Sequence, residues 1–477
     1  MGLLVPWILI LNGCFAGRYP VELDKELGNQ VNRQVVEQIG LYQDTKAGQY
    51  VQSIGERLVG NLGEQPFQFV FNLSDQAEPN AFALPGGYIY VSRGLMVLAN
   101  SEDELAGVIG HEIIHVTGRH AIRQMQKGII PGILSIPGKI VGNIVSKDVG
   151  TLLNAPINSA GSLMLASFSR GHENEADRLG ASLAAKSGYD PRALAVILGQ
   201  LEKAADSKEG KARKFSFFDS HPMTPDRLEK IERDADSTHW TRTDPVARDR
   251  SDFLGRMDGI AVEEDPALGV FRGRQFLHPD LNFTLTFPEG WKTMNTPSAV
   301  GAFADKKEGF AVLGIAGKDP DPDKLAQSFI DRVKNEQKTE PTEVRTVEFG
   351  EWRGTLVTYT DKTGREPMAI HILWVRMGPL TYELIGIGPE KFREALKQTA
   401  MSLRPMTQEE HASITVNRLR SAESRDGETL EEFGRRTDNA WSVPYTAIVN
   451  GLSEEGRLPA GKLIKISHRE PYVPDPQ

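Results

Sequence analysis

His111, Glu112 and His115 form an HExxH pattern that occurs once in this chain of 477 residues. Residues four apart share one face of a helix, so both imidazoles can bind a single zinc ion. Glu112 then reaches a water molecule beside the ion and can take its proton. The residue types and their spacing therefore predict the chemistry of a hydrolase.

A helix must hold both histidines, and the flanking sequence predicts one. Ser101 and Glu104 form a capping box, and three successive carboxylates lie at the positive end of the helix dipole. Basic residues follow the HExxH pattern, and Gly128 and Pro131 then end the helix. We expect one helix from residue 102 to about residue 127. The alternative, two unrelated histidines on a core helix, leaves their polar atoms without partners.

The position of the third ligand separates the classes of zinc peptidase. In the metzincin pattern this ligand is a histidine ten residues after the first, where this chain has Ala121. His120 comes one position early and would point about 100° away around a continuous helix, so we expect it to support a ligand or form a salt bridge. Glu173 is a better candidate, and Asp177, on the same face of a second predicted helix, would orient a histidine. The alternative is an exposed acidic turn, which fits Glu175 better.

Four ordered blocks of the sequence resemble metallopeptidase family forty-eight. They are NAFALPGGYIYV from residue 80, Gly94-Leu95, SEDELAGVIGHEIIHVTGRHA from residue 101, and ENEADRLG from residue 173 together with Gly188-Tyr189-Asp190-Pro191. This family includes CAAX prenyl endopeptidases, a membrane heat-shock zinc protease and periplasmic outer-membrane-assembly proteases, and the resemblance covers roughly residues 25 to 235. It implies that His111, His115 and Glu173 bind one zinc ion. It also implies that Glu112 is the catalytic base and that Asp177 supports a ligand.

The same resemblance covers the run SHPMTPDR, residues 220 to 227. In the outer-membrane-assembly branch, a histidine here can bind zinc as a fourth ligand and hold the enzyme latent, which indicates His221. Family members also place an arginine near the substrate or the oxyanion, which indicates Arg227 as a catalytic residue. The alternative is a helix start, with Thr224 as the N-cap and Pro225 in the first turn.

The run from Asn80 to Gly94 predicts a strand, a turn and a second strand. Gly86 and Gly87 permit a tight reversal, and Tyr88 to Val91 is apolar and β-prone. Such an edge strand can pair with an extended peptide, and Asn80 can hydrogen-bond the substrate backbone. The alternative, that the hairpin only covers the active-site helix, is compatible with this role.

Composition indicates a soluble globular protein, with 39% hydrophobic and 25% charged residues. The length exceeds that of a single core and suggests three domains. We expect a multidomain protein: a mainly α zincin-type metallopeptidase domain with a small β-hairpin or sheet, an α+β domain, and a small LysM-like α/β module. The net charge of -9 argues against nucleic acid as a partner. One cysteine excludes an internal disulfide framework.

The first residues predict export. Leu3 to Leu11 is apolar but too short to span a bilayer, and Leu11-Asn12-Gly13-Cys14 resembles a lipobox. We expect a signal or lipoprotein segment at residues 1–18 and an acyl anchor on Cys14, although no basic residue precedes Arg18. The expected location is the bacterial periplasm or the outer membrane, as a lipoprotein or peripheral protein and not as an integral membrane protein.

A second apolar stretch runs from Ile129 to Ala166. Three prolines, with Lys139 and Lys147, argue against a membrane span. A lid over the cleft and a helical pair on the core remain as alternatives.

The remaining residues divide by pattern. We expect the peptidase domain at 19–235, a polar linker at 236–265, the α+β accessory domain at 266–405 and the C-terminal module at 406–477. In the accessory domain His371 is isolated among strand residues and predicts no site. The C-terminal module resembles a degenerate LysM module in DGETLEEFGRRT, YTAIVNGL and GRLPAGKLIKI, although the insertion DNAWSVPY departs from that pattern. Such modules bind peptidoglycan glycans, and a protein-docking role is the alternative.

Together these features predict a zinc-dependent endopeptidase of the cell envelope that hydrolyses misfolded or envelope proteins, with Glu112 as general base and one zinc ion per chain. The expected partners are protein or peptide substrates and, through the C-terminal module, peptidoglycan. Two alternatives remain open: an envelope assembly factor or chaperone with a latent zinc site, and a peptidoglycan-binding protein whose metal site is structural.

Overall fold

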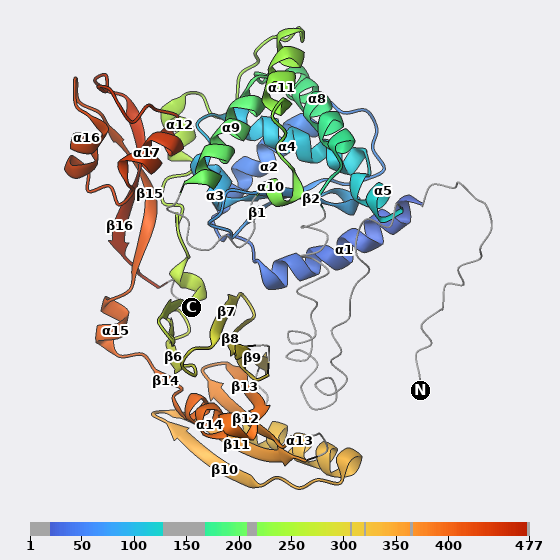
Figure 1. The fold of residues 1–477 in the computed structure, drawn as a ribbon, viewed down its shortest axis with the longest axis vertical. Coiled ribbons are helices and arrows are strands. Elements are labelled where there is room, and N and C mark those ends of the chain that lie inside the picture. Colours follow the sequence, from blue (N-terminus) through green and yellow to red (C-terminus); the bar gives the residue numbers. More distant parts are fainter. Residues whose placement is uncertain are drawn as a thin grey trace.

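The computed structural model describes residues 20–126, 167–207, 217–305, 308–318, 321–362 and 366–474. These residues form helices and four sheets that group into three parts (Figure 1). The predicted signal segment and the apolar stretch Ile129–Ala166 lie outside the described residues. Within the described ranges, no helix is long and apolar enough to cross a membrane.

The first part is mainly helical and contains the HExxH pattern. Its elements are α1 (Val21–Gln38), α2 (Thr45–Val59), β1 (Val70–Ser74), β2 (Ala81–Leu84), the short helix η1 (Pro85–Gly87), β3 (Tyr88–Ser92), α3 (Arg93–Leu98), α4 (Glu102–Thr117), α5 (His120–Gln126), α8 (Arg170–Lys186), α9 (Ala193–Asp206), α10 (Phe217–Ser220), α11 (Arg227–Asp236) and α12 (Arg250–Gly255). The strand order is β1-β3-β2, with β1 parallel and β2 antiparallel to β3. The prediction that Tyr88 to Val91 forms an edge strand is therefore wrong: this run lies in the central strand β3, because β1 pairs with its other side, and β2 is at the edge.

The small sheet is covered on both faces because side chains alternate along its central strand. Ile89 and Val91 enter the main core with residues of α2, α4 and α9, whereas Tyr90 packs with Phe82 and with Val35 of α1. The reversal between β2 and β3 requires glycine, since φ is 83° at Gly86 and 110° at Gly87. The predicted tight turn is confirmed.

Helix α4 begins where the sequence predicts but ends earlier. The Ser101 hydroxyl accepts a hydrogen bond from the Glu104 backbone N–H at 3.2 Å, which caps the first turn. The helix stops at Thr117, because Arg119 adopts a left-handed conformation with φ of 51° and a new helix, α5, starts at His120. The prediction of one helix to about residue 127 is therefore wrong.

The second part is built on a seven-stranded antiparallel sheet. Its elements are η2 (Pro266–Leu268), β4 (Val270–Arg272), β5 (Gln275–His278), β6 (Phe283–Thr286), β7 (Lys292–Thr296), β8 (Ala299–Phe303), β9 (Phe310–Lys318), α13 (Pro322–Gln337), β10 (Glu343–Phe349), β11 (Trp352–Asp361), β12 (Met368–Met377), β13 (Leu380–Pro389), η4 (Glu390–Phe392), α14 (Arg393–Met401) and β14 (Arg404–Pro405). The sheet order is β10-β11-β12-β13-β9-β8-β7, and a smaller sheet has the order β14-β6-β5-β4. Helices α13 and α14 pack in separate cores against this large sheet. His371 is 1% exposed, and its Nδ1 lies 3.0 Å from the Thr358 hydroxyl. Burial with a hydrogen-bond partner is typical of a structural histidine.

The third part has the order strand, helix, helix, strand. After the short helix α15 (Gln408–Ala412), these are β15 (Thr415–Glu423), α16 (Leu430–Arg436), α17 (Val443–Asn450) and β16 (Leu463–Pro471). The two strands pair in antiparallel register over their full length. Leu430, Phe433 and Ile464 form the small core between the strands and the helices.

The third part shares a core with the first. Leu419 of β15 and Val449 of α17 are buried in the same cluster as the interior residues of α4. Lys465 of β16 is fully buried, and its ammonium donates to the carbonyl oxygens of Val97 at 2.7 Å, Leu98 at 3.1 Å and Ala99 at 2.7 Å. These carbonyls lie at the end of α3, immediately before α4. Residues 236–265, expected as a linker, contain α12 and place Phe253 and Met257 in this core.

Candidate metal centre

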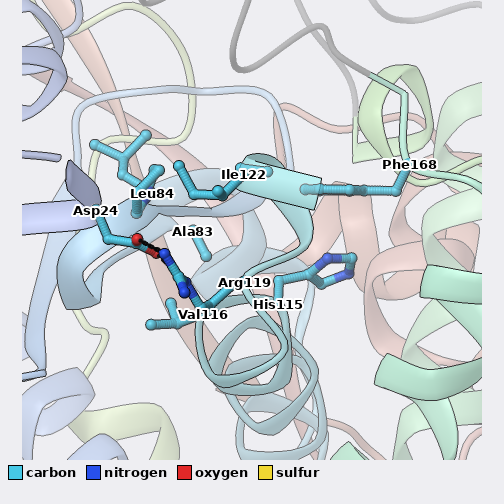
Figure 2. Close-up of a pocket in the computed structure, with 10 residues that line it drawn as sticks. Asp24, Ala83, Leu84, His115, Val116, Arg119, Ile122 and Phe168 are labelled. Carbon is cyan, nitrogen blue, oxygen red and sulfur yellow. Dashed lines mark hydrogen bonds and ion pairs between the residues drawn. The ribbon is translucent and has the colours of Figure 1, made fainter. Parts of the chain in front are cut away.

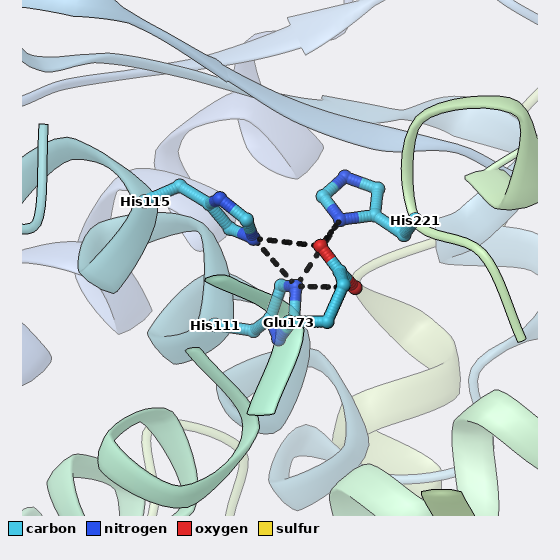
Figure 3. Close-up of side chains that lie close together, drawn as sticks. All are labelled: His111, His115, Glu173 and His221. Atoms are coloured by element: carbon cyan, nitrogen blue, oxygen red, sulfur yellow. Dashed lines mark hydrogen bonds and ion pairs between the residues drawn. The ribbon is translucent and has the colours of Figure 1, made fainter. Parts of the chain in front are cut away.

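Four side chains from three elements converge in the first part. His111 and His115 come from α4, Glu173 from α8, and His221 follows directly after α10 (Figure 3). One ligand atom from each lies within 4.8 Å of all the others, and all four residues are buried. Within the described ranges this is the group of histidine, cysteine and carboxylate side chains that could hold a metal ion.

The spacing of these atoms fits a tetrahedral zinc ion. The Nε2 atoms of His111 and His115 are 3.0 Å apart, and His115 Nε2 is 3.4 Å from Glu173 Oε1. His221 Nδ1 lies 3.2 Å from both His111 Nε2 and Glu173 Oε1. Ligands at the usual zinc distance stand about 3.3 Å apart around a tetrahedron. Two imidazoles, a carboxylate and a third imidazole are a donor set that zinc prefers.

Close packing of α4 against α8 brings Glu173 to the histidines. A Cβ atom on Gly180 would lie 2.8 Å from the backbone nitrogen of His111, and one on Gly110 would lie 3.0 Å from the carbonyl oxygen of Gly180. Two glycines therefore let the helix backbones meet at the level of the first ligand. This contact also sets Asp177, one turn after Glu173, beside His111.

Asp177 holds His111 through the ring nitrogen that faces away from the ligand group. Its Oδ1 is 3.0 Å from His111 Nδ1. Burial raises the pKa of Asp177, but hydrogen bonds from His111 and Arg227 outweigh this and leave the pKa below its usual value. The carboxylate thus accepts the Nδ1 proton and leaves Nε2 of His111 free to bind a metal.

Arg227 lies behind Glu173 and Asp177, and each nitrogen of its guanidinium group faces a protein oxygen. Nε and Nη2 donate to Asp177 at 2.8 Å each, and Nη2 is also 2.9 Å from Glu173 Oε2. Nη1 lies 3.3 Å from the carbonyl oxygens of His221 and Pro222. These contacts turn the guanidinium group toward Asp177, Glu173 and two backbone carbonyls, whereas the resemblance implies a contact with the substrate or the oxyanion.

Glu112 is fully buried, and among the described residues neither of its carboxylate oxygens has a hydrogen-bond partner. His221 Nε2 lies 3.5 Å from Oε1. Burial raises the pKa of this carboxyl above its usual value. A buried carboxyl group without a partner is costly, and a water molecule at the ligand group would satisfy it.

Two phenylalanine rings pack on imidazoles of the group, and the sequence pattern did not predict either contact. Phe168 lies 4.0 Å from the ring of His115, and Phe217 stacks on His221 at 4.3 Å with an angle of 15° between the rings. Phe217 stands four residues before His221 on a helical turn, and that spacing could have indicated the pair. Nothing in the sequence around Phe168 signals its contact.

A small pocket lies beside the ligand group (Figure 2). Its lining includes His115, Ala83 and Leu84 of the edge strand β2, and Asp24 of α1 paired with Arg119. Asn80 precedes β2 and is 4% exposed; its backbone N–H donates to the Ser92 hydroxyl at 2.8 Å. Its side-chain oxygen has no partner within the part of the chain that the structure describes.

Comparison with known proteins agrees with this geometry. Residues 45–235 match the profile of peptidase family M48. The metalloprotease LoiP of Escherichia coli K12 is 32% identical over 183 residues, which are 38% of this chain and 67% of that protein. This chain belongs to peptidase family M48. Its M48 domain contains the HExxH helix α4, Glu173 on α8 and His221.

Other relatives of the M48 domain are also proteases. A beta-barrel assembly-enhancing protease of Yersinia pestis is 31% identical over 214 residues, 44% of this chain and 43% of that protein. A mitochondrial metalloendopeptidase of Schizosaccharomyces pombe is 29% identical over 203 residues, 43% of this chain and 56% of that protein. The chain thus spans less than half the length of the Yersinia protein. The domain is a metalloendopeptidase domain of a zinc-dependent family, and the predicted zinc cofactor is confirmed at that level.

Proposed function

We propose that this protein is a zinc-dependent endopeptidase of the cell envelope that hydrolyses misfolded or envelope proteins. The observation that carries the proposal is the buried group of His111, His115 and Glu173 around one point, with the unpartnered carboxyl of Glu112 beside it. Relatives named as beta-barrel assembly-enhancing proteases support an envelope role.

His111, His115 and Glu173 would hold the ion. Zinc bound there supplies a Lewis acid that polarises a peptide carbonyl and makes water a better nucleophile. Glu112 accepts the proton of the attacking water and then donates it to the leaving amide nitrogen, a role that its raised pKa suits. Asp177 keeps His111 in the tautomer that binds zinc. Arg227 contacts Asp177 and Glu173 and would hold both carboxylates in place, a positioning role rather than the substrate contact that the resemblance implies.

Substrate would lie along the edge strand β2. This strand has a free edge in the described sheet and its residues line the pocket beside His115. An extended peptide can add to such an edge through backbone hydrogen bonds, which aligns many sequences without reading each side chain. The unpaired side-chain oxygen of Asn80 is placed at the start of this strand, and we propose that it accepts a hydrogen bond from the substrate backbone.

A second candidate is favoured by one observation: four protein ligands, His221 included, can close the zinc site. A closed site with four protein ligands is typical of structural or resting zinc, since catalysis needs an open position. This arrangement supports a latent peptidase, or an assembly factor whose site opens on demand. We propose that His221 must move away from the zinc ion before water and substrate can bind there.

Replacing His221 with alanine is expected to raise casein hydrolysis by about tenfold. This is the increase expected if about nine molecules in ten have His221 bound at the zinc site and only the remaining one is active. The exposed His239→Ala variant serves as the control and should match wild type. Initial rates at equal zinc content give the comparison. A lower rate for His221→Ala would refute latency and favour a contact of His221 with the oxyanion.

Localisation and further partners are also part of the proposal. We propose export through residues 1–18 and a lipid anchor on Cys14. The strand-helix-helix-strand order of the third part supports the LysM-like interpretation and, with it, binding to peptidoglycan. Because α17 and β16 contact the M48 domain, the glycan would bind on the remaining faces of this module.

The test of the proposed function is zinc content and peptidase activity of the purified chain. We expect one zinc ion per chain, loss of casein hydrolysis on chelation, and recovery on adding zinc but not magnesium. A chain that binds zinc but cleaves no protein, both as wild type and as His221→Ala, would support the assembly-factor alternative. A chain without zinc would contradict both.

A further inference from the structure

We propose that His120 is a positioning residue for the zinc ligand His115. The Nδ1 atoms of the two rings are 3.0 Å apart, and both residues are buried, with His120 fully so. A contact at this distance between two ring nitrogens is a hydrogen bond in which one nitrogen donates and the other accepts. The inference rests on the proposed function, because it assigns the support of a ligand in that zinc site.

The position of the ligand group decides which nitrogen donates. His115 turns Nε2 toward His111 and Glu173, so Nε2 must be free of its proton to bind zinc. The proton of neutral His115 then resides on Nδ1 and is donated to Nδ1 of His120. His120 is therefore the neutral tautomer with its proton on Nε2, which lies 3.5 Å from Glu175 Oε2.

The surroundings hold the His120 ring in this orientation. His172 stacks on it with a centroid distance of 4.4 Å and an angle of 6° between the rings. A Cβ atom on Gly118 would lie 2.5 Å from His120 Nε2 and 2.8 Å from Cδ2, so the ring occupies the space of a missing side chain. Gly118 is thus required for the contact as much as His120 is.

The break between α4 and α5 is what brings His120 to His115. On a continuous helix, His120 would point about 140° away from His115 around the helix axis, because it lies five residues further along the chain. The left-handed residue Arg119 interrupts the helix there, and Asp24 of α1 binds its guanidinium (Figure 2). The two ligands on α4 therefore have different supports: Asp177 gives His111 a charged acceptor, and His120 gives His115 a neutral one.

Three variants test this proposal through metal binding. His120→Leu removes the hydrogen-bond acceptor and replaces the ring with an apolar side chain that fills part of the same space. His120→Asn places an amide oxygen close to the former Nδ1 position and keeps an acceptor. His172→Phe keeps an aromatic ring stacked on His120 and does not change the bond between His120 and His115, so it serves as the matched control.

The readouts are the zinc dissociation constant, by competition with a chromogenic chelator, and the visible absorption of the Co²⁺-substituted protein. We expect His120→Leu to weaken zinc binding by about 10- to 100-fold, as loss of a partner to a ligating histidine does, and to shift the cobalt bands. His120→Asn and His172→Phe should stay within about threefold of wild type. These measurements do not need peptidase activity.

Equal zinc affinity and cobalt spectra in His120→Leu and wild type would overturn the proposal. An equal loss in His120→Leu, His120→Asn and His172→Phe would also overturn it, because packing and not the acceptor would then matter. If His120→Leu does not fold, Gly118→Ala decides, since it displaces the ring with His120 present and must alter the cobalt bands. Failure of wild type to bind zinc would instead contradict the proposed function itself.

Discussion

Replacing Glu112 with glutamine is expected to lower peptide hydrolysis by about 10²- to 10⁴-fold, the usual contribution of a general base. Glutamine keeps the size of the side chain but cannot accept a proton from water. Glu112 is not among the four side chains whose ligand atoms converge, so zinc should stay bound. Casein hydrolysis measures the expected loss of rate, and the zinc content of the same preparation shows whether the ion is retained.

The matched control is Glu202→Gln, which makes the same substitution at an exposed carboxylate on α9. It should leave rate and zinc content unchanged. Hydrolysis at the wild-type rate by the Glu112→Gln variant would show that another group takes the proton. Loss of zinc from that variant would place Glu112 among the ligands, against the geometry described here.

Replacing Lys465 with methionine is expected to destabilise the M48 domain by about 3–5 kcal/mol. Lys465 is fully buried, and its three protons meet three carbonyl oxygens at the end of α3. Burial lowers the pKa of this ammonium, and the nearby Glu104 carboxylate opposes that effect. Methionine fills the volume but leaves three buried carbonyls and Glu104 without their cation.

Urea unfolding followed by tryptophan fluorescence measures this loss, and amide hydrogen exchange locates it. We expect faster exchange at the junction of α3 and α4 as well as in β16. The control is Lys462→Met, a half-buried lysine just before the same strand, which should change stability by less than about 0.5 kcal/mol. Equal stability of the two variants would mean that Lys465 is replaceable and that the third part is held by its apolar contacts alone.

Local sequence predicted the start of the active-site helix and its two ligands because short-range rules govern them. The cap at Ser101 and the spacing of four between His111 and His115 depend only on helix geometry. Glu173 and Asp177 followed from the same spacing rule, and the family resemblance then agreed with that choice. For these residues, the arrangement in the structure agrees with the sequence prediction.

Contacts between distant residues decided what the sequence did not predict. The end of α4 depends on Asp24, which pairs with Arg119 across 95 positions. The setting of Arg227 depends on two carboxylates of α8, one of them 50 positions earlier. For α4 the local pattern allowed a longer helix, and tertiary packing selected the shorter one.

The bond between Lys465 and the end of α3 has a consequence for biogenesis. Lys465 and Leu98 stand 367 residues apart, so a ribosome must translate β16, long after α3, before this contact can form. The early helices therefore emerge with part of their interior still exposed, waiting for Leu419 and Val449. The core around α3 and α4 is therefore complete only once β15, α17 and β16 have been synthesised.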